Sequence, residues 1–228
     1  MPITTLTSAL EKITVANPFE VQALHQRVIR QLQEEGNATG LPVGTKAKDF
    51  GLPDSLGNQI NFADELAKGP VVLTFYRGGW CPYCNRQLKA YQEILPYIQA
   101  LGAQLIAVSP QLPDYTLSDQ EKAELSFKVL SDPKGIVAAK YNLLYEVPDY
   151  LKSLYLSHNI DLHEYNGMDH WLLPVTGTFM IDEYSVIRSA YVNPDFTKRM
   201  EPENILWELR KYNPFFAHNS FVKFNFPQ

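Results

Sequence analysis

The most informative segment of this chain reads Val71-Val72-Leu73-Thr74-Phe75-Tyr76 and continues as Arg77-Gly78-Gly79-Trp80-Cys81-Pro82-Tyr83-Cys84. Its first part is an unbroken run of mostly apolar and β-branched residues, which is typical of a buried strand. Its second part brings Cys81 and Cys84 to the end of that strand, at the start of an expected helix. Free N–H groups and the helix dipole at such a position stabilise a thiolate, the reactive form of cysteine. These are the only cysteines in 228 residues, so the pair is interpreted as a redox device.

The spacing of the two cysteines suits disulfide chemistry. If Cys81 caps the helix, Pro82 occupies the first helical position, where its missing N–H costs nothing. Cys84 then lies about one turn into the helix and can meet the sulfur of Cys81. Arg77 could place a positive charge beside them, and Trp80 is expected to shield the sulfurs. We therefore expect at least one thiol with a lowered pKa.

Other interpretations of the cysteine pair remain open. A pair with this spacing can be half of a structural zinc site, but the chain has no second pair, and the spacings of His158, His163 and His170 fit no familiar ligand pattern. We expect no metal. The thiols could also be inert core residues, since cysteine is often just a small buried side chain. Arg77 could equally be an exposed loop cation.

Composition excludes several classes of function. The chain is 45% hydrophobic and 20% charged, with a net charge of -5 and scattered basic residues. This argues against a nucleic-acid or anionic-membrane partner. No apolar run approaches the ~20 residues that span a bilayer, and no signal peptide is expected from the threonine-rich start. The expected compartment is the cytoplasm, where a close cysteine pair is more often catalytic than structural.

The order of expected elements predicts the fold class. Hydrophobic periodicity indicates a hairpin over 47–62, the strand 71–76, a helix from Cys84 and a strand over 104–109. A helix over 117–126, a strand over 127–130 and a helix over 134–141 follow, and then an antiparallel strand pair over 178–192 and a helix over 202–212. Alternation of strand and helix implies parallel pairing with helices on both faces of the sheet. The prediction is an α/β protein with a central mixed sheet.

The chain divides into three expected regions. Residues 1–40 form an N-terminal helical extension, with a helix over 6–35 interrupted at Asn17-Pro18. Residues 41–212 form the main domain, in which 142–170 is an irregular, partly helical insertion. The phenylalanine-rich tail 213–228 is interpreted as a segment that docks against its own domain or a second copy, which would make a homodimer.

Four segments resemble one family in the correct order: Phe75–Cys84, Leu101–Pro110, Val129–Asp132 and Leu173–Asp182. They closely resemble the peroxiredoxin-like proteins of the alkyl hydroperoxide reductase and thiol-specific antioxidant (AhpC/TSA) family. The resemblance covers roughly 41–212. It implies a thioredoxin-like fold, no bound cofactor, and reduction of peroxides or disulfides by thiol chemistry.

The resemblance leaves the attacking sulfur open. Typical peroxiredoxins carry a proline, then a threonine, then a peroxidatic cysteine separated from that threonine by two residues. Alignment puts Arg77 at the proline, Cys81 at the threonine and Cys84 at the peroxidatic position, whereas thioredoxin-like reductases attack with the first cysteine, Cys81. On the first alignment, Cys84 becomes a sulfenic acid that condenses with Cys81.

One family feature is absent. Typical peroxiredoxins have an arginine at about the position of Thr176, where it steers the peroxide and supports the thiolate. Thr176 cannot do this, and Pro174 lies two residues before the position at which thioredoxin-like proteins have a cis-proline. Arg77 or Arg188 is expected to compensate.

We therefore predict a thiol peroxidase that uses Cys84 and Cys81, with Arg77, Trp80 and Thr176 supporting the site. Its partners would be a peroxide and thioredoxin or a similar dithiol. One alternative is a thioredoxin-like disulfide oxidoreductase without significant peroxidase activity. The other is a redox-inert interaction protein, with 142–170 and the tail as contact surfaces.

Overall fold

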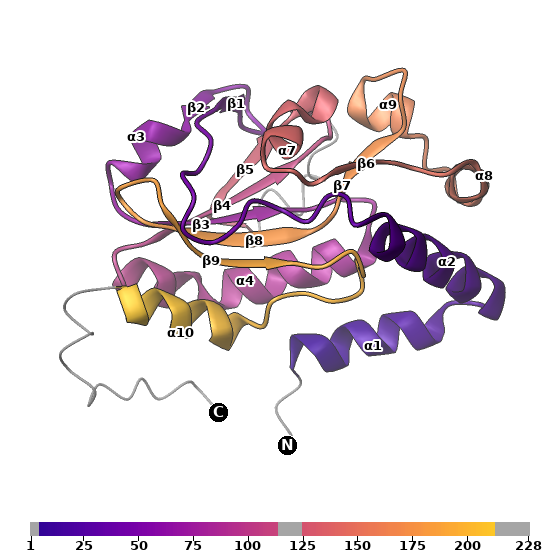
Figure 1. The fold of residues 1–228 in the computed structure, drawn as a ribbon, viewed down its shortest axis with the longest axis horizontal. Coiled ribbons are helices and arrows are strands. Elements are labelled where there is room, and N and C mark those ends of the chain that lie inside the picture. The colour runs from indigo at the N-terminus through magenta and orange to yellow at the C-terminus, as the bar shows by residue number, and fades with distance from the viewer. Residues whose placement is uncertain (1–4, 114–124, 213–228) are drawn as a thin grey trace.

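The computed structural model describes residues 5–113 and 125–212 (Figure 1). Most of the helix predicted over 117–126 lies outside these residues, and so does the tail 213–228. The described part shows the predicted α/β architecture, a central mixed sheet with helices on both faces.

The central sheet has five strands in the order β5-β4-β3-β8-β9. β3 (Val71–Phe75) is the middle strand, is fully buried and pairs in parallel with β4 (Gln104–Ser109), which in turn pairs in parallel with β5 (Lys128–Ser131). On its other side β3 pairs antiparallel with β8 (Gly177–Ile181), and β8 pairs antiparallel with β9 (Ile187–Val192). The predicted parallel and antiparallel pairings are thus confirmed.

Helices cover the two faces of this sheet. α4 (Pro82–Ala100) and α10 (Pro202–Tyr212) lie side by side on one face, and α3 (Phe62–Leu66) and α7 (Ile136–Lys140) lie on the other (Figure 1). A single turn of 3₁₀ helix, η1 (Pro133–Gly135), precedes α7. Each face has its own hydrophobic cluster, with α4 in the first and α3 and α7 in the second. Burial on both faces explains why β3 is apolar throughout.

Two short strand pairs lie outside the central sheet. β1 (Gly51–Pro53) and β2 (Gln59–Asn61) form the predicted antiparallel hairpin. β6 (Leu144–Glu146) pairs antiparallel with β7 (Leu172–Pro174), which closes the base of the 142–170 segment.

Four helices gather near the N-terminal end of α4. α1 (Leu6–Ala16) and α2 (Phe19–Glu35) break at Asn17-Pro18, where the sequence predicted an interruption. α8 (Asp149–Ser157) and α9 (Leu162–Asn166) form much of the 142–170 segment, which is more regular than expected. α1 packs on α4 and α2 packs on α8, so the N-terminal extension and the insertion meet beside the dithiol (Figure 1).

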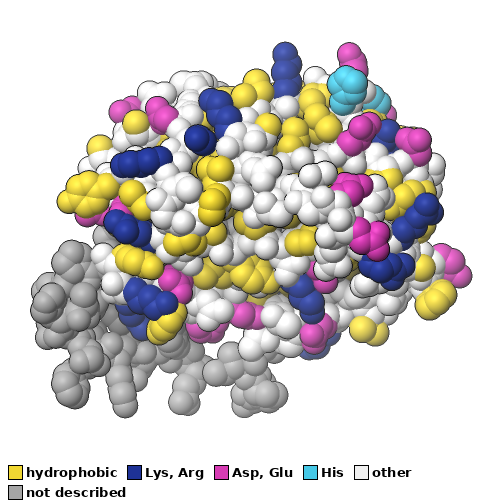
Figure 2. All heavy atoms as spheres, viewed as in Figure 1, with side chains coloured by type: hydrophobic (Ala, Val, Ile, Leu, Met, Phe, Trp, Pro, Cys, Tyr) yellow, Lys and Arg dark blue, Asp and Glu magenta, His cyan; other side chains and the backbone are white. Residues whose placement is uncertain are grey.

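The visible face of the protein in Figure 2 is mixed in charge. Figure 2 shows basic and acidic side chains interspersed with apolar ones over the visible face. Among the described residues, no helix combines the length and apolar character needed to cross a membrane.

Candidate active site

The dithiol sits where β3 passes into α4. Cys81 is the N-cap residue of α4, and Pro82 is its first helical residue. The backbone N–H of Cys84 donates to the carbonyl oxygen of Cys81 at 3.0 Å, which closes the first turn. Both thiols are free and buried, with exposed fractions of 1% for Cys81 and 0% for Cys84. The local geometry is the one that the spacing of the cysteines predicts.

A tight loop joins the end of β3 to the start of α4. Gly78 has φ +148°, and a Cβ at this position would overlap the indole of Trp80 and the side chain of Gln111, so glycine is required there. The carbonyl oxygen of Gly78 accepts from the N–H of Cys81 at 3.1 Å, and the N–H of Gly79 donates to Gln111 Oε1 at 2.6 Å. The loop glycines therefore allow close packing of the protein's own side chains.

Arg199, from the loop before α10, reaches the deeper sulfur. Its Nη2 donates to Cys84 Sγ at 3.5 Å. Its Nε donates to Gln87 Oε1 at 2.6 Å, and its Nη1 donates to the carbonyl oxygens of Phe196 and Lys198. The residue is only 5% exposed. Because its three nitrogens are all engaged, its position against Cys84 is set by the fold.

A buried polar network ties this arginine to the sheet. Gln87 Nε2 donates to Thr74 Oγ1 at 3.0 Å, and the Thr74 and Thr178 hydroxyls lie 3.0 Å apart. The hydroxyl of Tyr91 donates to the carbonyl oxygen of Met200 at 3.0 Å. The network holds α4, β3, β8 and the Arg199 loop together, and such satisfied buried networks rigidify a site.

Arg77 lies on the other side of the dithiol. Its Nη1 is 3.9 Å from Cys81 Sγ, and its Nη2 donates to the hydroxyl of Tyr155. The guanidinium carbon lies 4.1 Å from the ring centre of Phe196 and 4.9 Å from that of Trp80. With an exposed fraction of 2%, Arg77 is a buried cation in an aromatic cage, not an exposed loop residue.

The two arginines are not neutralised by carboxylates. Among the described residues, no Asp or Glu forms an ion pair with Arg77 or Arg199. Unpaired charges are costly in a protein interior. A thiolate between the two guanidinium groups would relieve that cost, so the site favours one ionised sulfur.

That sulfur is Cys84. Burial is the largest effect on it and raises its pKa, but a hydrogen bond from Cys81, the charges of Arg199 and Arg77, and the backbone N–H of Arg77 hold the pKa of Cys84 well below the usual value. Burial, together with the hydrogen bond to Cys84 and the charge on it, raises the pKa of Cys81 well above the usual value. The arrangement is a protonated Cys81 that donates to a Cys84 thiolate.

A cavity of about 250 Å³ opens onto the site. It touches Cys81, and Cys84 is not part of its lining. Its walls come from α2, α4, α8 and the loops next to them, and from the Arg199 loop: Asn17, Val21, His25, Arg77, Trp80, Pro82, Tyr83, Leu154, Tyr155, His158, Ile160 and Phe196. The ring of Trp80 lies 5.2 Å from that of Tyr155 in this wall.

Thr176 lies in the loop before β8 and is 2% exposed. Its hydroxyl has no hydrogen-bond partner among the described residues. No hydrogen bond therefore joins it to either sulfur, and the positive charges beside the two sulfurs come from Arg77 and Arg199.

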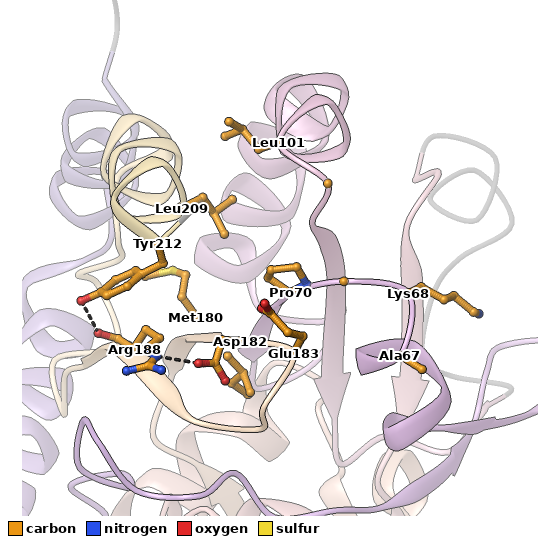
Figure 3. Close-up of a pocket in the computed structure, with 13 residues that line it drawn as sticks. Ala67, Lys68, Pro70, Leu101, Met180, Asp182, Glu183, Arg188, Leu209 and Tyr212 are labelled. Atoms are coloured by element: carbon orange, nitrogen blue, oxygen red, sulfur yellow. Dashed lines mark hydrogen bonds and ion pairs between the residues drawn. The ribbon is translucent and has the colours of Figure 1, made fainter. Parts of the chain in front are cut away.

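Arg188 does not compensate for the missing arginine. It is the second residue of β9, at the far end of the sheet from the dithiol. There its Nε donates to Asp182 Oδ2 at 2.6 Å, and its carbonyl oxygen accepts from the hydroxyl of Tyr212 at 3.1 Å (Figure 3). These residues line a second cavity of about 360 Å³ beside Leu209. That cavity is larger than the one at the dithiol, but no cysteine lines it. The expectation for Arg188 was wrong because Arg188 lies near the beginning of β9, at the Val71 end of the sheet, whereas the dithiol follows the Phe75 end of β3.

Sequence reasoning missed Arg199. The absence of arginine at Thr176 indicated that a cation had to come from elsewhere, but no spacing rule links residues 84 and 199. In the described part of the chain, no group of three or more His, Cys, Asp or Glu side chains is placed so that it could hold a metal ion.

A dithiol at the start of the helix that follows the central strand of a mixed five-stranded sheet defines a thioredoxin-fold thiol oxidoreductase. The family can be stated more closely. The model of the AhpC/TSA family matches residues 43–190, and the chain belongs to that family.

Relatives of two kinds share this region. A protein of Mycobacterium tuberculosis whose name assigns it provisionally to the peroxiredoxins is 29% identical over 116 residues, which is 51% of this chain and 73% of the relative. The thiol-disulfide oxidoreductase ResA of Geobacillus kaustophilus is 31% identical over 106 residues, 46% of this chain and 60% of the relative. These similarities support thiol redox chemistry without separating a peroxide from a disulfide as the substrate.

Solved structures show the same fold. The crystal structure of peroxidoxin BcpB from Mycobacterium tuberculosis superposes with a TM-score of 0.58 and 22% identity, covering 75% of this chain and 98% of that one. The mitochondrial 2-Cys peroxiredoxin of Plasmodium falciparum also has a TM-score of 0.58, with 16% identity, 80% of this chain and all of that one.

Proposed function

We propose that this protein is a thiol-dependent peroxidase that reduces hydrogen peroxide or organic hydroperoxides through a dithiol–disulfide cycle of Cys84 and Cys81. The observation that carries the proposal is the contact of 3.5 Å between Arg199 Nη2 and Cys84 Sγ, in a site with two buried cations that form no ion pair with any described carboxylate. A peroxidase needs a thiolate at neutral pH, and this arrangement supplies one.

The first step is attack of the Cys84 thiolate on one oxygen of the peroxide. The O–O bond breaks, Cys84 becomes a sulfenic acid, and the other oxygen leaves as an alkoxide or hydroxide. Cys81 is the nearest proton donor because its raised pKa keeps it protonated and it already donates to Cys84. Transfer of that proton releases an alcohol or water and leaves a Cys81 thiolate beside Arg77.

The second step closes the disulfide. The Cys81 thiolate attacks the sulfenic sulfur of Cys84, the S–O bond breaks, and hydroxide leaves and becomes water by taking up a proton from the buffered solvent. Two electrons have then passed from the dithiol to the peroxide. An external thiol must return them, and thioredoxin or a similar dithiol is the reductant that the family resemblance implies.

A stopped-flow experiment tests this function. Reduced protein is mixed with hydrogen peroxide, and tryptophan fluorescence and thiol loss are followed together. We expect a second-order rate constant at least about a hundredfold above that of free cysteine, because a positioned thiolate with a stabilised leaving group gains two or more orders of magnitude. A rate constant no better than that of free cysteine would exclude the peroxidase.

A disulfide oxidoreductase without peroxidase activity is the second candidate. One observation favours it: the sulfur that lines the cavity is Cys81, the cysteine with which thioredoxin-like reductases attack. Similarity to ResA points the same way. Rapid turnover of insulin or glutathione disulfide by a preparation that is slow with peroxide would establish this function instead.

A further inference from the structure

The two sulfurs differ in how a molecule from solution can reach them. Cys81 forms part of the wall of the 250 Å³ cavity, whereas Cys84 lies one helical turn deeper, is fully buried and is in contact with Arg199. In a Cys81–Cys84 disulfide, an entering thiol therefore meets Cys81 first. The chemistry of the cavity then decides which thiols can enter.

We propose that this cavity is the binding site of the reductant, and that the reductant is a low-molecular-weight thiol carrying a carboxylate. This proposal rests on the dithiol–disulfide cycle of the proposed function. It replaces thioredoxin, a protein dithiol, as the molecule that resets the disulfide.

The exchange chemistry fits attack at Cys81. The entering thiolate attacks Cys81 Sγ, the S–S bond breaks, and the electron pair leaves with Cys84 as a thiolate. Attack is fastest when the leaving thiol is the more acidic one. Arg199 stabilises Cys84 as a thiolate, so Cys84 is the better leaving group. A second molecule of the thiol then attacks the mixed disulfide, releases Cys81 as the thiol and departs as the low-molecular-weight disulfide.

The size of the cavity favours a small molecule. A volume of about 250 Å³ corresponds to roughly eight water molecules at ~30 Å³ each. α2 and α8 pack against each other next to Cys81. A protein dithiol would have to bring its own sulfur to a Cys81 that is 1% exposed, and the paired helices stand in its way.

The charge of the cavity favours an anion. Arg77 lines it, and its Nε is buried without a hydrogen-bond partner among the described residues. Among the residues that the structure describes, no Asp or Glu contributes to the lining. Burial, then the charge of Arg77, lowers the pKa of His25 to about 4, although the charge of Asp195 acts in the opposite direction, so His25 is neutral near pH 7. The cavity thus offers the positive charge of Arg77 and two buried donors, Arg77 Nε and Trp80 Nε1, that have no hydrogen-bond partner among the described residues.

Part of the cavity lining comes from segments outside the residues that the family model matches. Asn17, Val21 and His25 come from the N-terminal helices, and Phe196 comes from the loop after β9. All four positions lie outside residues 43–190. The extension therefore narrows access to a site that the family domain builds.

Three thiols of nearly equal size test the proposal. The full-length protein is oxidised to its disulfide with diamide, without peroxide, and is then mixed with 3-mercaptopropionate, 2-mercaptoethanol or cysteamine. Rate constants for reduction are expressed per thiolate. We expect 3-mercaptopropionate to exceed cysteamine by at least about tenfold, with 2-mercaptoethanol between them, because the lining carries a cation and no carboxylate. Equal rate constants, or a faster cysteamine, would overturn the proposal, and so would a rate constant for thioredoxin above that of 3-mercaptopropionate.

A charge placed in the cavity provides the second test. His25→Glu is expected to reduce the ratio of the 3-mercaptopropionate and cysteamine rate constants by about tenfold or more. Val15→Glu adds the same charge to an exposed position of α1 that is not in the lining, and it is expected to leave the ratio unchanged. A ratio that stays constant in a folded His25→Glu variant contradicts the proposal. Since the disulfide is made with diamide, failure here is distinct from a failure to react with peroxide.

Discussion

Arg199 and Cys84 are 115 positions apart in the chain, yet Nη2 of the arginine lies 3.5 Å from Sγ of the cysteine. The guanidinium is held there by Gln87 and by two backbone carbonyl oxygens. Charge-assisted hydrogen bonds are about twice as strong as neutral ones. The contact thus favours Cys84 over Cys81 as the ionised sulfur.

Replacing Arg199 is expected to impair the thiolate. Arg199→Met removes the charge, raises the pKa of Cys84 and lowers the rate constant with hydrogen peroxide at neutral pH by about 10- to 100-fold, which corresponds to ~1.4 to 2.7 kcal/mol. Arg199→Lys keeps the positive charge but loses the planar donor geometry, so its rate constant should lie between those of the wild type and Arg199→Met. Ultraviolet titration of the thiolate and stopped-flow kinetics measure both effects.

Arg188→Met is the matched control for that variant, because Arg188 is paired with Asp182 at the far end of the sheet. It should leave the thiolate titration unchanged. An Arg199→Met protein that titrates like the wild type would show that Arg199 does not stabilise Cys84.

The roles of the two sulfurs can be separated by trapping. In Cys81→Ser, the sulfenic acid on Cys84 has no cysteine with which to condense, so a sulfenic-acid reagent should label Cys84 after one equivalent of peroxide. Cys84→Ser should give little label, since burial raises the pKa of Cys81 and keeps it protonated. Mass spectrometry of the labelled peptide reads the outcome. Label on Cys81 alone would reverse the assignment.

His25 should make the stability of the protein pH-dependent. Its pKa is about 4 in the folded protein and 6.5 as the reference value, because burial and Arg77 disfavour the charged ring. Below pH 6.5 the unfolded chain binds a proton that the folded protein does not, so stability falls between pH 6.5 and 4. We expect ~1–2 kcal/mol of this loss to disappear in His25→Phe. Urea denaturation at pH 7 and pH 4.5 gives the difference, and parallel curves for the two proteins would contradict it.

Glu201 should anchor the N-terminal helix. Its carboxylate accepts from the backbone N–H of Leu6 at 3.0 Å and of Thr7 at 2.7 Å, two donors that the first turn of α1 leaves free. Glu201→Ala is expected to cost about 1–2 kcal/mol, as for loss of a helix cap. Amide hydrogen exchange at α1 should accelerate, whereas Glu93→Ala, at an exposed position of α4, should have no such effect. Unchanged exchange in α1 would refute the anchoring role.

Much of the architecture followed from local patterns. The apolar run 71–76, the helix that begins at Pro82 and the antiparallel pair near the C-terminal end all lie where periodicity and chain breakers placed them. The hairpin within 47–62 and the helix over 202–212 also lie where they were predicted. These features depend on residues close together in the chain, so sequence alone was sufficient to predict them.

The sequence by itself determined that two thiols meet at the start of a helix in an AhpC/TSA chain. Only the tertiary structure decided which cation supports them, which sulfur is ionised and which one lines a cavity. The physical reason is that a pKa in a protein interior depends on every charge within a few ångströms, whatever its position in the chain. The loop before α10 brings Arg199 to Cys84, and the antiparallel pairing of β8 and β9 leaves Arg188 at the opposite end of the sheet. Neither outcome can be obtained from residue spacing, because each depends on how distant elements pack across one sheet.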